Sequence, residues 1–294
     1  MEVVILCGGK GTRSYPFTEY FPKPMMPING TPILVHLMRI YADQGFSKFV
    51  LSAGHRKEIL DDYFSGRFPD WDVKIVDTGS DADTGDRIRR CADFVGDTFF
   101  ATYGDGLGDL DLRALLRFHQ ESRGLATVTS VPLRSQYGTL VFSPDGQVHE
   151  FREKPVIRDY WINAGFFVFD KHAFDHWQGH NLEGDVLPAL SARQQLYSYT
   201  HEGFWKSMDT SKDQQELERL YTHGAPWVAR RSAGASERRT GVDRRARNHG
   251  RAEGERRAVD RRVAKPSFGV IHQTAIVQAG PDVNRRPTPI VLGA

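Results

Sequence analysis

The sequence contains little cysteine: among 294 residues only Cys7 and Cys91 occur. Neither belongs to a Cys-x-x-Cys pair or to a spacing typical of metal ligands. We therefore expect neither a scaffold held by disulfides nor a structural zinc site, and such a composition fits a reducing compartment.

Long hydrophobic runs are also missing. The apolar run at residues 3–6 is too short for a signal peptide and ends at glycines, and no later segment is long enough to span a membrane. We therefore expect a cytoplasmic protein without a membrane span. Hydrophobic residues still make up 39% of the chain, which is enough for a packed core in one large domain or two smaller ones.

The small net charge of +2 hides an uneven distribution. Residues 229–294 contain fourteen Arg and one Lys against six acidic residues, which leaves 24 basic and 31 acidic residues for residues 1–228. The C-terminal segment also has few apolar residues to bury, a composition that favours disorder. The sequence therefore predicts a globular domain at 1–228 and an Arg-rich, disordered tail at 229–294.

The densest motif follows the first apolar run and reads Gly8-Gly9-Lys10-Gly11-Thr12-Arg13. Because glycine lacks a Cβ, successive backbone N–H groups can turn toward one anion, and Arg13 and Lys23 would add positive charge. No Gly-Lys-Ser/Thr closes the motif as in a P-loop, and Ser14 replaces the third glycine of a dinucleotide fingerprint. The motif predicts a phosphate-binding loop, although glycines alone would equally well make a tight turn.

Strand-like apolar runs alternate with amphipathic helical patterns along the first 228 residues. This alternation predicts an α/β fold, Rossmann-like, with a mixed, mainly parallel sheet and helices on both faces. We expect Thr31 to cap the first long helix, with Pro32 at its first position. A Ser-Pro-Asp-Gly turn at 143–146 predicts a hairpin of strands 139–142 and 148–151 that joins the sheet. The strands are expected at 3–6, 49–51, 73–76, 98–103, 126–131 and 166–169, and the helices at 32–44, 56–65, 86–95, 111–122, 171–177, 184–193 and 213–221.

Two aspartates are candidate metal ligands. Asp105 follows a predicted strand, and ligands of open α/β sheets collect at the carboxyl ends of strands, so it could face the same crevice as the glycine motif. Asp209 lies in a later loop. Mg²⁺ commonly takes one or two carboxylates together with substrate phosphates, but most aspartates in such loops are turn residues.

Together with Pro22-Lys23-Pro24, the glycine motif resembles the N-terminal pattern of the sugar-1-phosphate nucleotidyltransferases, Gly-Gly-x-Gly-Thr-Arg followed by Pro-Lys-Pro. The resemblance covers residues 1 to about 228 and implies a fold of the nucleotide-diphospho-sugar transferase type. It also implies an enzyme that transfers a nucleotidyl group from a nucleoside triphosphate to a sugar 1-phosphate and releases pyrophosphate. Further matches are Gly104-Asp105-Gly106, Glu153-Lys154-Pro155, Asn163-Ala164-Gly165 and Met208-Asp209-Thr210.

The resemblance implies a role for each matching residue. Arg13 and Lys23 would be catalytic, and Asp105 and Asp209 would hold Mg²⁺. Without the resemblance, Glu153-Lys154 would be interpreted as a solvated charged turn. The implied nucleotide-binding residues are Gly8, Gly9, Gly11, Thr12, Thr84, Gly85 and Arg87. The implied residues that bind the sugar phosphate are Tyr137, Gly138, Glu153, Lys154, Asn163 and Gly165.

Within that family, Asp77-Thr78-Gly79 followed by Thr84-Gly85-Asp86-Arg87 looks most like the glucose-1-phosphate cytidylyltransferases, which implies CTP and glucose 1-phosphate as substrates. One departure concerns the segment between a predicted helix and the Asp-Thr-Gly strand. Here it consists of residues 65–72, whereas those enzymes usually carry a longer segment at this place.

Two alternatives come from other functional classes. One is a silent sensor of nucleotide sugars, which would not require both aspartates and both basic residues. The other is binding of nucleic acid or an anionic membrane surface by the Arg-rich tail. A homo-oligomer is compatible with the sequence.

Overall fold

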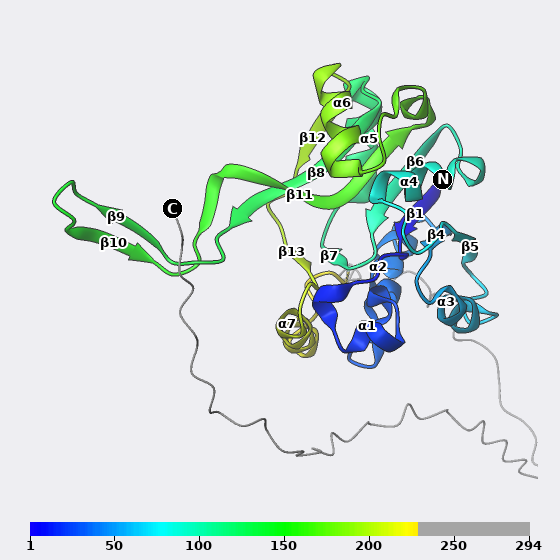
Figure 1. Cartoon of the computed structure of the whole chain (residues 1–294), viewed down its shortest axis with the longest axis horizontal. Coiled ribbons are helices and arrows are strands. Elements are labelled where there is room, and N and C mark those ends of the chain that lie inside the picture. The colour runs from blue at the N-terminus through cyan, green and yellow to red at the C-terminus, as the bar shows by residue number, and fades with distance from the viewer. Residues whose placement is uncertain (229–294) are drawn as a thin grey trace, which may run out of the picture. The chain divides into compact units, whose positions relative to one another are not determined.

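A computed structural model describes residues 1–228, and the predicted Arg-rich tail lies outside them. The core is a seven-stranded sheet of order β12-β8-β11-β6-β1-β4-β5 (Figure 1). Neighbouring strands are parallel except β11, which runs antiparallel to both β6 and β8. The predicted α/β fold with a mixed, mainly parallel sheet is confirmed. The strands are β1 (Glu2–Leu6), β4 (Lys48–Ala53), β5 (Asp72–Asp77), β6 (Thr98–Tyr103), β8 (Ala126–Arg134), β11 (Val156–Asp170) and β12 (Leu196–Thr200).

Helices cover both faces of this sheet. Because side chains alternate along a strand, Val3 and Ile5 of β1 lie in one hydrophobic core and Val4 lies in the other. The first core is closed by α2 (Ile33–Ala42), α3 (Lys57–Phe64), α5 (Leu112–Ser122) and α7 (Ser211–Thr222), and the second by α4 (Thr84–Arg89) and α6 (Leu187–Ala192). The helix α1 (Phe17–Tyr20) and short 3₁₀ turns at Thr12–Ser14, Lys23–Met25, Ala92–Phe94 and Lys171–His176 lie in the connections, and a π turn at Leu182–Val186 precedes α6.

Two local predictions were wrong. Thr31 does not cap a helix: it belongs to β3 (Thr31–Pro32), which pairs with β2 (Pro27–Ile28), and α2 begins after Pro32 without a side-chain cap. The helix predicted at 86–95 ends at Arg89, and a separate 3₁₀ turn follows. A two-residue strand in the first place and a 3₁₀ turn in the second replace the expected helical end, which a hydrophobic pattern does not record.

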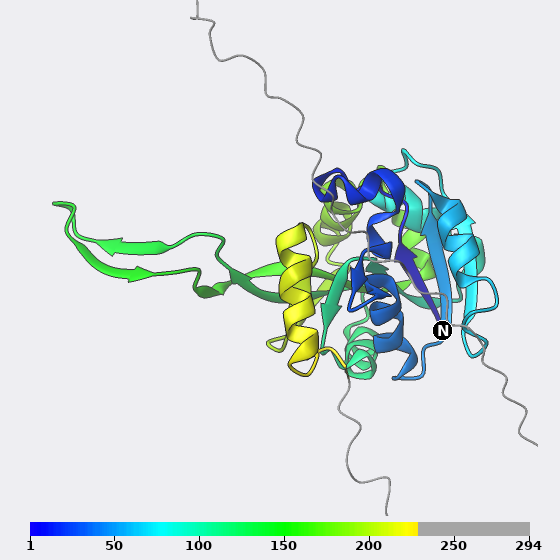
Figure 2. The same cartoon turned by 90° about the horizontal axis from the view of Figure 1, so that it is seen from below.

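The predicted hairpin forms but does not join the main sheet. Strands β9 (Thr139–Phe142) and β10 (Val148–Arg152) make a two-stranded sheet of their own. They stand clear of the rest of the described chain in two perpendicular views (Figures 1 and 2). The reason is that the first half of β11, residues 156–163, pairs only with residues 130–134 at the end of β8. Strands β8 and β11 therefore extend together past the main sheet. We call residues 135–155 the arm and the rest of 1–228 the body.

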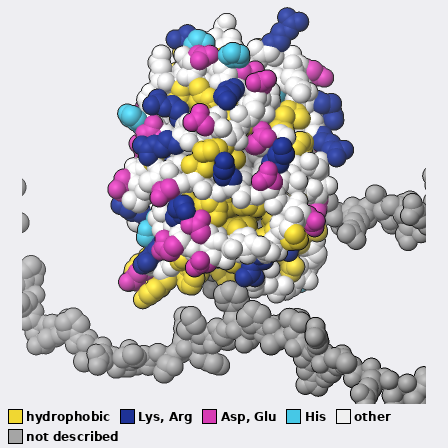
Figure 3. Space-filling model, turned by 90° about the vertical axis from the view of Figure 1, so that its right-hand side faces the viewer, with side chains coloured by type: hydrophobic (Ala, Val, Ile, Leu, Met, Phe, Trp, Pro, Cys, Tyr) yellow, Lys and Arg dark blue, Asp and Glu magenta, His cyan; other side chains and the backbone are white. Residues whose placement is uncertain are grey.

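On the side of the body opposite the arm, positively and negatively charged side chains are interspersed, with small hydrophobic groups between them (Figure 3). Within residues 1–228, no helix is long and apolar enough to cross a membrane.

Candidate active site

Four of the predicted residues meet at the carboxyl edge of the sheet. The ammonium of Lys23 lies 2.6 Å from Asp105 Oδ2 and 2.9 Å from Asp209 Oδ1, and a guanidinium nitrogen of Arg13 lies 3.0 Å from Asp209 Oδ1. Asp105 follows β6, whereas Lys23 and Arg13 lie in the 3₁₀ turns after β1. These side chains are up to 196 positions apart in sequence, so tertiary structure alone brings them together. We call Arg13, Lys23, Asp105 and Asp209 the cluster.

A small two-stranded sheet places the two aspartates side by side. Strand β7 (Gly106–Gly108) pairs with β13 (Trp205–Ser207), and the backbone N–H of Met208 donates to the carbonyl of Asp105 at 2.9 Å. Because Asp105 immediately precedes β7 and Asp209 lies two residues after β13, the pairing of these strands brings the two aspartates together. Both strands are only three residues long and were missing from the sequence prediction.

The cluster holds its charges by mutual attraction. Burial opposes the charged form of Lys23, but the attraction and hydrogen bonds of Asp105 and Asp209 outweigh it and raise the Lys23 pKa. Burial likewise opposes ionisation of Asp209, yet the hydrogen bonds and charges of Lys23, Ser207 and Arg13 lower the pKa of that carboxyl. The lysine is therefore cationic and Asp209 anionic at neutral pH.

Further hydrogen bonds fix Asp209. Ser207 Oγ donates to its Oδ2 at 2.9 Å, Ser14 Oγ donates to its carbonyl at 3.1 Å, and its N–H donates to Asp213 Oδ2 at 3.2 Å. Thr210 and Asp213 also form a reciprocal capping box at the start of α7. These supports were not predicted from the sequence, although Thr-x-x-Asp before an amphipathic helix signals such a cap.

The carboxylates of the cluster fit a divalent cation. Both already face one compact cation, the Lys23 ammonium, and carboxylate oxygens are the ligands that Mg²⁺ prefers. Among the described residues, no group of three or more His, Cys, Asp or Glu forms a metal-binding cluster. A metal at this edge would therefore take two protein carboxylates and complete its coordination with water and substrate oxygens.

The glycine loop runs beside the cluster. Gly11 has a φ of +59°, and a Cβ there would lie 2.9 Å from Cβ of Lys23, so a larger residue would displace the lysine. At Gly8 a Cβ would lie 1.8 Å from a guanidinium nitrogen of Arg87. At Gly9, by contrast, nothing lies within 4 Å of such an atom, so the backbone faces open space that a phosphate can approach.

Arg87 holds the glycine loop from behind. Its side chain is buried, and its nitrogens donate to the carbonyls of Gly8 at 3.0 Å, Gly79 at 2.9 Å and Ser80 at 3.2 Å. It therefore ties the glycine loop to the segment after β5, with its donors directed at protein acceptors. The resemblance had assigned Arg87 to nucleotide contact, whereas its position in the fold suits support of the loop.

The segment after β5 borders an open pocket of about 530 Å³ beside the glycine loop. At the surface, an ion pair of 2.7 Å between Lys10 and Asp81 joins the glycine loop to the segment after β5. The pocket is lined by Gly79, Ser80, Asp81, Ala82, Asp83, Asp86, Arg90 and His180.

A hydrogen-bond network links predicted nucleotide and sugar residues. Thr84 Oγ1 donates to Glu183 Oε2 at 2.7 Å, the hydroxyl of Tyr103 donates to the other oxygen of Glu183, and the Asn163 amide donates to the Tyr103 oxygen at 3.2 Å. Burial and the negative charge of Glu183 raise the pKa of Tyr103. Tyr103 and Glu183 were missing from the sequence prediction because no single motif contains both.

Two other predicted residues pack tightly around this network. A Cβ at Gly165 would lie 2.2 Å from the Tyr103 ring, and one at Gly85 would lie 2.6 Å from the carbonyl of His180. Thr12 lies in the 3₁₀ turn of Arg13.

The remaining sugar-phosphate residues lie on the arm. Glu153 and Lys154 form an ion pair of 3.6 Å with each other, and a Cβ at Gly138 would lie 3.2 Å from Glu153 Oε2. Tyr137, next to them, is 79% exposed. The structure therefore divides the predicted sugar set: Asn163 and Gly165 stay with the body, and the other four residues form a separate group.

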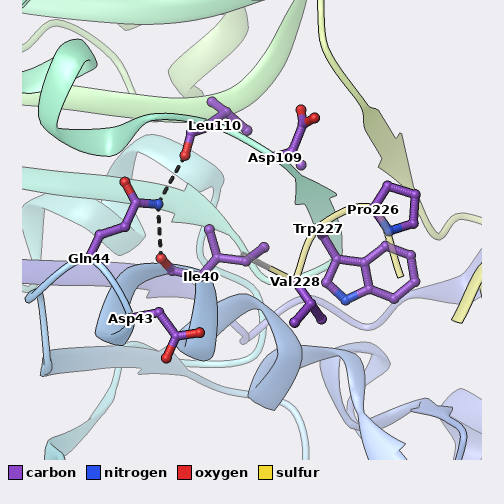
Figure 4. Close-up of a pocket in the computed structure, with 9 residues that line it drawn as sticks. Ile40, Asp43, Gln44, Asp109, Leu110, Pro226, Trp227 and Val228 are labelled. Carbon is purple, nitrogen blue, oxygen red and sulfur yellow. Dashed lines mark hydrogen bonds between the residues drawn. The ribbon is translucent and has the colours of Figure 1, made fainter. Parts of the chain in front are cut away.

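A second pocket, of about 270 Å³, lies between the end of α2 and the last described residues (Figure 4). Gln44 bridges its wall by donating to the carbonyls of Ile40 and Leu110 at 3.1 and 2.9 Å. It contains none of the predicted site residues. Pro226, Trp227 and Val228 form its other side.

Comparison with known proteins defines the class of this protein. A family model described as Nucleotidyl transferase matches residues 2–222. The chain belongs to this nucleotidyl transferase family, and it is a nucleotidyltransferase that acts on sugar 1-phosphates.

Among its relatives are two glucose-1-phosphate cytidylyltransferases. The chain is 37% identical over 249 residues to a probable one from Bacillus subtilis (strain 168), covering 76% of this chain and 97% of that protein. It is 36% identical over 254 residues to one from Salmonella typhi, covering 77% and 98%. A UTP–glucose-1-phosphate uridylyltransferase from Synechocystis is 32% identical over 65% of this chain and 55% of its own length.

Solved structures share the fold. HddC from Yersinia pseudotuberculosis superimposes with a TM-score of 0.59 at 23% identity, covering 75% of this chain and 99% of that one. A putative glucose-1-phosphate thymidylyltransferase from Bacillus anthracis gives a TM-score of 0.58 at 20% identity, covering 75% and 94%. These likenesses confirm the nucleotide-diphospho-sugar transferase type of fold.

Proposed function

We propose that the protein transfers a cytidylyl group from CTP to glucose 1-phosphate, releasing pyrophosphate and forming CDP-glucose. This choice of substrates rests on the share of each relative's length that aligns with this chain. Alignments with the two cytidylyltransferases span 97–98% of those proteins, whereas the alignment with the uridylyltransferase spans 55% of it. The Asp-Thr-Gly and Thr-Gly-Asp-Arg motifs at 77–87 support the same assignment.

The reaction joins two anions, so charge and position are the main tasks of the protein. An oxygen of the sugar phosphate attacks the α-phosphorus of CTP, a new P–O bond forms, and the bond to the pyrophosphate oxygen breaks. Backbone N–H groups at the open Gly9 would bind the triphosphate. Arg13 would offset the charge of the departing pyrophosphate, and Lys23 that of the α-phosphate.

We further propose that Asp105 and Asp209 hold Mg²⁺, which would neutralise part of the triphosphate charge. Lys23 now bridges these carboxylates, so in the loaded site it would turn toward the phosphates. Arg87 would keep the glycine loop in place throughout. Asn163 would orient the sugar, and Lys154 would bind its phosphate, as the resemblance implies.

The test is pyrophosphate release by the full chain with glucose 1-phosphate, Mg²⁺ and each of CTP, UTP, dTTP, ATP and GTP in parallel. Release with CTP is expected to exceed that with every other nucleotide, and chelation of Mg²⁺ is expected to abolish it. Release with another nucleotide would keep the reaction and reject the cytidylyl assignment. Binding of a nucleotide sugar without any release would favour the sensor alternative.

A further inference from the structure

Lys10 occupies the variable position of the motif Gly-Gly-x-Gly-Thr-Arg, so the family pattern gives it no role. Its side chain is 58% exposed, and its ammonium lies 2.7 Å from Asp81 Oδ1. Asp81 belongs to the segment after β5 and lines the open pocket of about 530 Å³ beside the glycine loop. The ammonium of Lys10 therefore lies at the edge of this pocket.

The backbone on either side of Lys10 suits an anion. Of the described residues, none apart from the chain neighbours lies within 4 Å of a Cβ placed on Gly9, and Gly11 has the left-handed φ of +59°. Successive N–H groups in such a turn can point toward one anion. A phosphate bound there would lie beside Lys10. A lysine in a glycine-rich loop binds outer phosphates as a point charge, as it does in P-loops.

The cluster does not by itself neutralise a triphosphate. Its two cations already face its two carboxylates, so the four side chains together carry no net charge. A single Mg²⁺ would neutralise only part of the charge on three phosphate groups. A further cation at the glycine loop would offset part of the remainder, and Lys10 is a cation that the loop itself supplies.

The ion pair with Asp81 leaves Lys10 free to change partners. The two side chains are 58% and 80% exposed, and exposed ion pairs contribute little to stability because water solvates either partner well. The hydrogen bond and charge of Lys10 lower the pKa of Asp81, so this carboxylate is anionic at neutral pH. Because lysine carries its ammonium on a flexible stem, Lys10 can exchange the carboxylate for a phosphate oxygen at small cost.

We propose that Lys10 binds the outer phosphates of CTP and that Asp81 competes with these phosphates for its ammonium. The inference rests on the proposed function, which supplies the triphosphate. When CTP binds, the ammonium leaves Asp81 for phosphate oxygens, and the ion pair between the glycine loop and the segment after β5 opens. Since the outer phosphates depart as pyrophosphate, Lys10 would share the charge of the leaving group with Arg13.

The phosphate contact is tested by calorimetric titration of the full chain with CTP and Mg²⁺, without glucose 1-phosphate so that no acceptor is present. Lys10→Gln is expected to raise Kd for CTP about 10-fold and to change Kd for CMP less than about twofold, because CMP lacks the outer phosphates. Lys48→Gln is the matched control. Lys48 is 57% exposed and pairs with Glu2 at the opposite edge of the sheet, so both constants should stay unchanged.

Asp81→Asn distinguishes competition from a simple clamp between the two segments. If Asp81 competes for the ammonium, its loss frees Lys10 and should lower Kd for CTP about 2- to 5-fold. In the Lys10→Gln background the same substitution should have a smaller effect, because no ammonium is left to release. An ion pair that only held the segments together would raise Kd when either partner is lost. That result, or an unchanged Kd for CTP in Lys10→Gln, would overturn the proposal.

A second probe separates this inference from the proposed function. Inorganic tripolyphosphate has three linked phosphates but no base or sugar, so its titration in the presence of Mg²⁺ tests Lys10 without reference to the nucleotide. A wild type that turns over no nucleotide would overturn the proposed function, whereas weaker binding of tripolyphosphate by Lys10→Gln would still support the phosphate contact. An active wild type whose Lys10→Gln variant binds CTP and tripolyphosphate equally well would overturn this inference alone.

Discussion

The carboxyl edge of the sheet and the arm each carry part of the predicted site, but the protein fixes them very differently. At the edge, the side chain of Lys23 is 11% exposed and contacts two carboxylates, which are themselves held by neighbouring hydrogen bonds. On the arm, the side chain of Lys154 is 49% exposed and pairs with its neighbour Glu153. The first geometry is set by packing against residues far apart in sequence, whereas the second is an ion pair between sequence neighbours on an exposed hairpin.

The largest effect is expected at the edge, from Asp105→Ala. Lys23 would lose its closest partner, and a proposed ligand of Mg²⁺ would disappear, so kcat should fall by about 10³-fold or more. Pyrophosphate release measures the loss, and circular dichroism should show an intact fold. Asp62→Ala, at an exposed carboxylate of α3, should retain full activity. Near-normal turnover by Asp105→Ala would remove this residue from the mechanism.

On the arm, Lys154→Ala should mainly weaken substrate binding. We expect KM for glucose 1-phosphate to rise about 10- to 100-fold while KM for CTP changes little, because one charged contact to the sugar phosphate is lost. Initial rates over both substrate concentrations separate the two constants. Lys57→Ala removes a lysine from α3 in the body and should leave both unchanged. An equal rise in both constants would contradict the division of the site.

Arg87→Lys tests whether the hydrogen bonds of Arg87 hold the glycine loop in place at the carboxyl edge of the sheet. A lysine has no planar fork and cannot bond the carbonyls of Gly8, Gly79 and Ser80 together. KM for CTP should rise about 10-fold and the melting temperature should fall by several degrees. Arg89→Lys makes the same change at an exposed position of the same helix and should be silent. Unchanged nucleotide binding in Arg87→Lys would show that the glycine loop keeps its shape unaided.

The smallest effect is expected in the pH dependence of stability. The folded-state pKa of Asp209 is lowered, so its stabilising contribution is present above the ordinary aspartate pKa of 3.8 and is lost as pH falls through the folded value. Asp209→Asn removes this contribution. Below pH 4, the free energy of unfolding of this variant should therefore fall less steeply with decreasing pH than that of the wild type. The difference between the two slopes should correspond to less than about one bound proton.

Urea unfolding at several acidic pH values measures this slope. Asp145→Asn supplies a comparison from the arm, where the lowered pKa comes from Ser143 in an exposed turn rather than from the cluster. Identical acid slopes in the wild type and Asp209→Asn would contradict the assigned interactions.

Much of the fold was predictable because its signals are local. The apolar runs that became β4, β5 and β6 and the amphipathic pattern of α5 reflect burial of one or both faces, which a sequence records directly. The predictions failed where backbone geometry decided the outcome. Thr31 resembles a helix cap but pairs with a neighbouring strand. The hairpin of strands 139–142 and 148–151 was predicted correctly, whereas its separation from the main sheet was not predicted.

The candidate site was predictable as a set of motifs but not as an arrangement. Arg13, Lys23, Asp105 and Asp209 come from four motifs, and nothing in their spacing shows that one ammonium bridges both carboxylates. Arg87 was expected to contact nucleotide, and only the folded chain shows that its guanidinium lies against Gly8. Glu183 was missed because its partners Thr84 and Tyr103 lie 99 and 80 positions away.

By itself, the sequence determined which chemical groups the protein has and the class of fold that carries them, because residue type, glycine content and hydrophobic period are local properties of the chain. Tertiary structure alone decided which groups meet. The pairing of β7 with β13 placed Asp105 beside Asp209, and the extension of β8 and β11 past the sheet carried Lys154 away from both. Distances between residues far apart in sequence follow from strand pairing and packing, which only the folded chain specifies.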